Sequence, residues 1–181
     1  MSLSVVLDAC VLYRAALRDT LLRAAEKGLC RAYWSSEILH ETTRNLIADG
    51  RVSKNQATHL ISMMTAAFPE ALVDGYEPLV DKMTNDPKDR HVVAAAIHCG
   101  AHVIVTSNLD DFPDDALSPH GVEALSPDKF LCGLFHRDSD TMLLILEEQG
   151  ADLSPPRTVG QVLDVLQSTV PKFVEMVRAS A

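Results

Sequence analysis

The sequence predicts an α/β fold in which a central parallel sheet lies between two layers of helices, followed by a helical extension at the C-terminus. Up to Leu131, short and nearly continuous apolar runs alternate with segments of helical periodicity, which is typical of a parallel sheet covered on both faces. Beyond Leu131 only helical periodicity remains. We therefore expect residues 1–131 to form the α/β domain and residues 132–181 to form the extension.

The apolar runs indicate where the strands lie. Runs suitable for the sheet are Leu3 to Leu7, Cys30 to Ser35, His102 to Thr106 and Gly121 to Leu125. The last of these is expected to be an edge strand, and a shorter strand is expected near Leu72.

Capping signals indicate where the helices begin and end. Ser53 with Gln56 has the spacing of a capping box. The clearest signal is NDPKDRHVVAAAIHCG, in which Asp86 is the expected N-cap, Pro87 the first helical residue and Gly100 the C-cap. This segment therefore predicts a helix that leads directly into the strand beginning at His102.

The extension carries many apolar side chains at helical spacing. These residues must be covered, either by the α/β domain, by a second copy of the chain or by another protein. We predict that the extension packs mainly on its own α/β domain.

Composition limits the class of protein. Of the 181 residues, 47% are hydrophobic and 23% charged, and no apolar run approaches the roughly 18 residues needed to cross a membrane. The start, MSLSVVLDAC, lacks the basic region of a signal peptide, so a cytoplasmic location is expected. The four cysteines form no C-x-x-C pair and are expected to be reduced and mostly buried. The net charge of −9 argues against binding nucleic acid through a basic surface, although bound cations in an acidic pocket can still attract phosphate.

Acidic side chains follow the predicted strands at the points where ligands bind in open parallel sheets. Four separate segments deliver acidic or amide groups to this edge. These groups are Asp8, Glu41, the pair Asp86 and Asp89, and the trio Asn108, Asp110 and Asp111. Because clustered carboxylates repel one another, they persist only if protonated or bridged by cations. Hard oxygen ligands favour Mg²⁺ or Mn²⁺, and such ions support phosphodiester hydrolysis by activating water and stabilising charge on phosphate.

The same residues resemble the PIN-domain family. The matching pieces, in order, are VVLDACVLY, SSEILHETTRNL, NDPKDRHVVAAAIHCGAHVIVTSNLDDFP and LSPDKFL, which together span about residues 3 to 131. The resemblance implies a doubly wound sheet and an acidic site for Mg²⁺ or Mn²⁺. Many members are ribonuclease toxins of VapC type, so the implied partners are an RNA substrate and a small antitoxin protein, and a homodimer is a further candidate assembly.

The resemblance also assigns roles to residues. It implies that Asp8, Glu41, Asp89 and Asp111 are the catalytic and metal-binding carboxylates, and that Asp86 is an additional metal ligand. Thr106 and Asn108 correspond to polar positions that position the substrate. Because some members have a carboxylate where this chain has Asn108, the fourth ligand is either Asp111 or Asn108.

Other functions are compatible with part of this pattern. A related nuclease could serve RNA processing or cut DNA without being a toxin, and a domain that has lost catalysis could act as a binding module. A phosphatase or nucleotide-binding protein is disfavoured, because no phosphate-binding glycine motif occurs and Asp8-Ala9-Cys10 lacks a second aspartate.

Overall fold

A computed structural model describes residues 3–180 of the chain. Its centre is a parallel sheet with strand order β2-β1-β3-β4. The strands are β1 (Leu3–Leu7), β2 (Cys30–Tyr33), β3 (Val103–Val105) and β4 (Glu123–Leu125). The register pairs Val5 with Ala32 on one side and with Val103 on the other, so β1 lies in the middle of the sheet. All four predicted strands are confirmed, with β4 at an edge.

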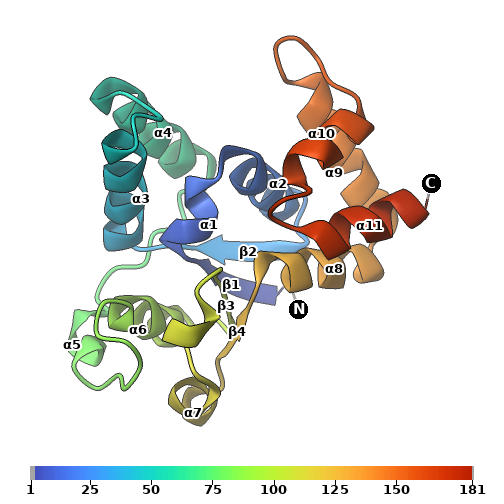
Figure 1. Cartoon of the computed structure of the whole chain (residues 1–181). Helices are drawn as coiled ribbons and strands as arrows, with labels where there is room; N and C mark the ends of the chain where they lie inside the picture. Colours follow the sequence, from blue (N-terminus) through green and yellow to red (C-terminus); the bar gives the residue numbers. More distant parts are fainter. Residues whose placement is uncertain (1–2, 181) are drawn as a thin grey trace.

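Helices cover both faces of the sheet, as Figure 1 shows. One layer contains α1 (Ala9–Tyr13), α2 (Ala15–Glu26), α3 (Ser36–Ala48) and α4 (Lys54–Ala67). The other layer contains α5 (Glu77–Val80), α6 (Arg90–Cys99) and α7 (Asp114–Leu117). The three-layer α/β/α arrangement predicted from the sequence is therefore confirmed.

Burial explains why the middle strands are so apolar. Val5, Val6, Ile104 and Val105 are completely buried, since helices cover them from both sides. On α6, the run Ala94–Ala96 is also completely buried, and its small side chains let this helix pack closely on β1 and β3. This packing fixes the N-terminus of α6 beside the carboxyl ends of the strands.

Local structure differs from the sequence prediction at three places. Helix α6 begins at Arg90 and not at Pro87, because the Asp86 side chain accepts a 3.0 Å hydrogen bond from the Lys88 backbone and forms a turn instead of a helix cap. The strand expected near Leu72 is reduced to a single bridge between Leu72 and Trp34. Only Cys30 of the four free cysteines is fully buried, and the other three are partly exposed.

The C-terminal helices are α8 (Pro127–Arg137), α9 (Ser139–Ala151), α10 (Val159–Leu166) and α11 (Pro171–Ala179). The boundary expected after Leu131 falls inside α8, so the helical extension begins at Pro127. Helices α9 and α10 pack against α2, as predicted. A buried polar contact helps to fix this interface: Thr20 donates a 2.8 Å hydrogen bond to Gln149, whose amide donates a 3.0 Å bond to the Ala16 carbonyl. The apolar face of the extension is thus covered by its own chain.

Within residues 3–180, no helix combines the length and apolar character required to cross a lipid bilayer.

Candidate active site

Asp8 occupies the position where β1 ends and α1 begins. Its side chain is 3% exposed, and one carboxylate oxygen accepts a 2.8 Å hydrogen bond from the Ala9 backbone, which caps α1. Its other oxygen accepts a 2.7 Å hydrogen bond from the Thr106 hydroxyl. Oδ2 also accepts a 3.4 Å hydrogen bond from the Cys10 thiol, so Oδ1, with a second lone pair, keeps the clearer capacity to bind a cation.

Thr106 is completely buried at the end of β3. Its hydroxyl donates to Asp8 and accepts a 3.1 Å hydrogen bond from the Asn108 backbone. Because Thr106 is buried and bonded to Asp8, it is better placed to orient Asp8 than to contact a substrate directly.

Cys10 lies beside the same pair of residues, with its sulfur 3.4 Å from Oδ2 of Asp8. Burial, together with the neighbouring Asp8, raises the pKa of the Cys10 thiol to about 11. The thiol is therefore protonated at neutral pH, which argues against a role as a nucleophile.

Asp89 lies immediately before α6, and its electrostatic environment is the clearest property of the site. Burial, as the largest cause, and four other carboxylates together raise the pKa of Asp89 from 3.8 to about 7. In decreasing order of effect, these are Asp8, Asp111, Glu41 and Asp86. The other four acidic residues predicted from the sequence thus lie within electrostatic range of Asp89, although the five come from four separate segments.

Glu41 lies on α3 and is partly buried. Burial raises its pKa, and the nearby Asp8 acts in the same direction, whereas His91 and Arg44 oppose the shift. The imidazole of His91 lies between two acids of α3, with Nε2 3.9 Å from Glu41 and Nδ1 3.7 Å from Glu37.

His91 is a residue of this site that the sequence analysis missed. It is only 5% exposed, and its Nδ1 has no hydrogen-bond partner. A signal was present in the sequence, because His91 is a polar residue in the otherwise small and apolar run HVVAAAI, two positions after Asp89.

The loop after β3 brings Asp111 to the site. Phe112 is 2% exposed and anchors this loop next to Asp111. The Asp111 carbonyl accepts hydrogen bonds from the Asp86 backbone at 3.4 Å and from the Asn85 amide at 3.3 Å. These bonds join the β3 loop to the segment before α6. Asp110 is exposed and is not among the residues that shift the pKa of Asp89.

The donor set suits a hard divalent cation. Asp8, Asp86, Asp89 and Asp111 take part in none of the ion pairs found in residues 3–180. Their mutual repulsion is therefore not balanced by lysine or arginine, and a divalent cation would relieve it. In the same part of the chain, no three His, Cys, Asp or Glu side chains lie close enough to form a complete metal site as they stand. The acids therefore affect one another electrostatically, but their side chains are not arranged around a common point as metal ligands would be.

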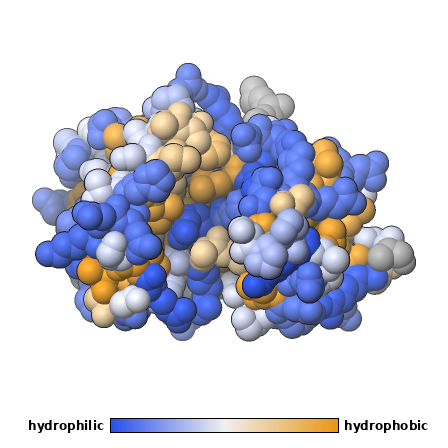
Figure 2. Space-filling view, turned by 90° about the horizontal axis from the view of Figure 1, so that it is seen from above, coloured by the Kyte–Doolittle hydropathy of each residue, from blue (hydrophilic) through white to orange (hydrophobic). Residues whose placement is uncertain are grey.

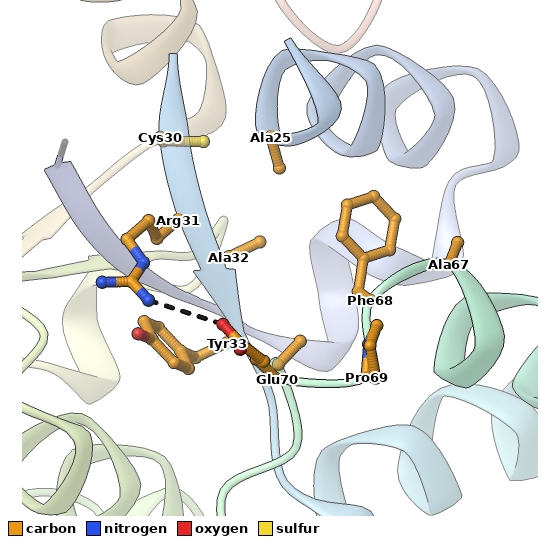
Figure 3. A pocket seen from close by; sticks show the side chains of 10 residues that line it. Ala25, Cys30, Arg31, Ala32, Tyr33, Ala67, Phe68, Pro69 and Glu70 are labelled. Carbon is orange, nitrogen blue, oxygen red and sulfur yellow. Dashed lines mark ion pairs between the residues drawn. The ribbon is translucent and has the colours of Figure 1, made fainter. Parts of the chain in front are cut away.

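Two surface recesses differ in their position relative to the acidic residues. Figure 2 views the molecule from above and shows a largely hydrophilic surface that is hollowed between two raised parts. One recess, of about 350 Å³, has Cys10, Ser107 and Asn108 in its wall and adjoins the acidic site. Another, of about 290 Å³, lies along the outer side of β2 (Figure 3), where Arg31 and Glu70 form a 3.6 Å ion pair and most of the other lining side chains are apolar. The second recess contains none of the predicted site residues.

Comparison with known families agrees with this architecture. A family model described as "PIN domain" matches residues 4–110, and a model described as "VapC50 C-terminal domain" matches residues 127–179. The second match begins where α8 begins.

One curated relative also matches the chain. A Mycobacterium tuberculosis protein named "Putative ribonuclease VapC50" is 45% identical over 109 residues, which cover 60% of this chain and 64% of that protein. The chain therefore spans less than two thirds of the length of this relative. No solved structure gives a significant match.

Proposed function

This chain belongs to the PIN-domain family, and from this premise we propose that it is a metal-dependent endoribonuclease that acts as the toxin of a VapBC-type pair. The observation that carries the proposal is the electrostatic effect on Asp89 of four other carboxylates, so that five acids from four segments act at one place. The name of the M. tuberculosis relative, a ribonuclease, adds support for RNA as the substrate.

In the proposed site, Asp8, Glu41, Asp89 and Asp111 hold Mg²⁺ or Mn²⁺, with Asp86 as an additional ligand. Asp111 is preferred to Asn108 as the fourth ligand, because Asp111 acts on Asp89 electrostatically whereas Asn108 is exposed and faces the neighbouring recess. When bound, the metal supplies an activated water and stabilises negative charge on the phosphate.

The protein's own contribution is to hold these carboxylates in a fixed orientation. The Thr106 hydroxyl and the Ala9 backbone fix Asp8, so that its free lone pair faces a constant direction. His91, in the opposite layer of helices, lies 3.9 Å from Glu41 and would attract this carboxylate when its imidazole is protonated. Since Asp8 is buried and Glu41 and Asp89 are partly desolvated, charge on the metal would be less screened than in water and would act more strongly on the phosphate.

Cleavage of RNA by the purified chain tests this proposal. Wild-type protein, Asp8→Asn and the control Asp110→Asn are incubated with structured and single-stranded RNA in Mg²⁺, Mn²⁺ or EDTA. We expect cleavage by wild type and Asp110→Asn only with metal, and none by Asp8→Asn. If chelation and Asp8→Asn both leave cleavage unchanged, the proposed mechanism is wrong. DNA of the same sequence, tested in parallel, separates a ribonuclease from a nuclease that also cuts DNA.

The antitoxin pairing requires a separate test. A small reading frame next to the gene is co-expressed with the chain. We expect a stable complex and inhibition of cleavage. If no small neighbouring protein binds, the toxin assignment fails, while the nuclease activity is unaffected by this result.

A further inference from the structure

The recess of about 350 Å³ next to the acidic site is built from three parts of the chain. Helix α1 and the residue after it contribute Cys10, Tyr13 and Arg14, the C-terminal end of α3 contributes Asn45, Ala48 and Asp49, and the loop after β3 contributes Ser107 and Asn108. This volume lies in the range of about 300–1,000 Å³ that is typical of small-molecule sites.

This recess, which we call the α1–α3 recess, shares a wall with the acidic site. The sulfur of Cys10 lies 3.4 Å from Asp8 and 3.4 Å from the Thr106 hydroxyl, and it accepts a 3.3 Å hydrogen bond from the Ser107 backbone. On α3, Asn45 follows Glu41 by four residues, so both side chains lie on the same face of the helix. A molecule in the α1–α3 recess would therefore lie directly beside a phosphate held at the carboxylates.

The lining has the chemistry that recognises an unpaired base. Tyr13 is partly exposed, and its hydroxyl donates a 2.6 Å hydrogen bond to Asp49, which holds the ring in one orientation. The amides of Asn45 and Asn108 are exposed and have no hydrogen-bond partner among residues 3–180. Each amide offers both a donor and an acceptor to the edge of a base.

Charge in the recess is also suited to a nucleotide. Arg14 is exposed and forms no ion pair with any residue between 3 and 180, so its guanidinium is available to a phosphate. Asp49 is already engaged by Tyr13. This bond does not neutralise Asp49, so the recess combines an aromatic side chain, two amides, one cation and one anion.

We propose that the α1–α3 recess binds the base of the nucleotide adjacent to the cleaved phosphate, and that it selects single-stranded RNA by requiring that base to be unstacked. This inference rests on the proposed ribonuclease function. Tyr13 stacks on the base, Asn45 and Asn108 read its edge, and Arg14 contacts the next phosphate. A base held in a duplex cannot enter such a recess, because its edge and faces are already occupied.

Binding measurements test the recess independently of cleavage. A labelled single-stranded RNA pentamer and its duplex form are titrated by fluorescence anisotropy against Asp89→Asn, which is used as the parent protein. We expect the single strand to bind more tightly than the duplex. Adding Tyr13→Leu should weaken single-strand binding about tenfold, consistent with the typical contribution of base stacking. Adding Asn45→Ala should also weaken it, because hydrogen bonds to the base edge are lost. The matched control, Asn55→Ala on the exposed surface of α4, should leave binding unchanged.

Cleavage of a randomised single-stranded RNA pool with Mn²⁺ provides the second measurement. Wild type should show a base preference at one position next to the cut, and Asn45→Ala and Asn108→Ala should reduce it. If recess substitutions leave both pentamer binding and base preference unchanged, the inference is overturned while the ribonuclease proposal stands. If no RNA is cleaved but pentamer binding still depends on Tyr13 and Asn45, the recess is supported and the ribonuclease proposal fails.

Discussion

The hydroxyl of Thr106 donates a 2.7 Å hydrogen bond to the carboxylate of Asp8, and this bond joins the carboxyl ends of two neighbouring strands. Both side chains are buried, so neither can exchange this partner for solvent without a local rearrangement. The orientation of the proposed metal ligand therefore depends on a residue that is distant in sequence.

Replacing Thr106 with valine preserves the shape of the side chain and removes this hydrogen bond. We expect the free energy of unfolding to fall by about 2 kcal/mol, since hydrogen bonds to charged groups contribute about 1.5–3 kcal/mol. Mn²⁺ affinity should also fall, because Asp8 loses its orientation. Thr43→Val is the control, since the Thr43 hydroxyl bonds only to carbonyls of its own helix. Urea unfolding and Mn²⁺ titration provide the measurements, and equal effects of the two substitutions would contradict the prediction.

Asp89→Asn should stabilise the metal-free protein and abolish its proposed activity. The substitution removes a charge that burial and four neighbouring carboxylates disfavour. We expect Tm in EDTA at pH 8 to rise by about 2–4 °C for each kcal/mol gained, and cleavage to fall at least about a hundredfold. Asp110→Asn, on the nearby loop, should change neither quantity. A lower Tm for Asp89→Asn would show that the five acids do not repel one another in solution.

The pH dependence of stability follows from the same residue. In the folded chain the pKa of Asp89 is raised from 3.8 to about 7, so between these values the folded state binds more protons than the unfolded state. The stability of the metal-free protein should therefore fall as pH rises from about 4 to about 7. Glu41, whose pKa is also raised, acts in the same direction.

Thermal unfolding in EDTA at pH 5 and pH 8 measures this effect. Mn²⁺ should restore stability at pH 8 and have little effect at pH 5, where protons compete for the same carboxylates. In the Asp89→Asn variant, the Tm in EDTA should differ less between pH 5 and pH 8. A metal-free protein whose Tm rises steadily over this range would contradict the assignment.

His91 should act as a positioning residue for Glu41. Residues that orient metal ligands typically contribute about 10–100-fold to metal affinity or activity. We expect His91→Leu to raise the Mn²⁺ concentration needed for half-maximal cleavage about tenfold, and His91→Gln to have a smaller effect because it keeps a hydrogen-bond donor. His59→Leu, on the exposed surface of α4, should leave this concentration unchanged. A purely structural role would lower Tm in both His91 variants without a shift in metal dependence.

Gln149 should be important for stability and irrelevant to metal binding. Gln149→Ala leaves the Thr20 hydroxyl and the Ala16 carbonyl without this buried partner, at a cost of about 2 kcal/mol. Gln167→Ala, at an exposed position of the extension, should have little effect. One cooperative transition in calorimetry is expected for the whole chain. If a chain ending at Ser126, between β4 and α8, melts at the same temperature as the full protein, the extension does not stabilise the α/β domain.

Much of the fold could be predicted from the sequence because its strands and helices obey local rules. The continuous apolar strands and the Ser53–Gln56 capping box are both as expected. The sequence also predicted which acids converge, since the carboxyl ends of parallel strands meet at one edge. The assignment of these acids as metal ligands remains a prediction.

Other features depend on contacts that no local pattern contains. The predicted start of α6 was wrong because an aspartate such as Asp86 is equally compatible with a helix cap and with a turn. Its hydrogen bond from the Lys88 backbone favours the turn. His91 was missed because its importance comes from two acids on another helix. The role of Thr106 likewise becomes visible only when β1 and β3 are placed side by side.

Helix α3 carries Glu41 toward the carboxylates and Asn45 toward the α1–α3 recess, one helical turn further along. Under the two proposals above, this one helix sets the distance between the cleaved phosphate and the bound base. One residue inserted between these two positions would rotate one relative to the other by about 100°. Such an insertion should uncouple where the RNA is cut from which base is read, even if each part remained intact.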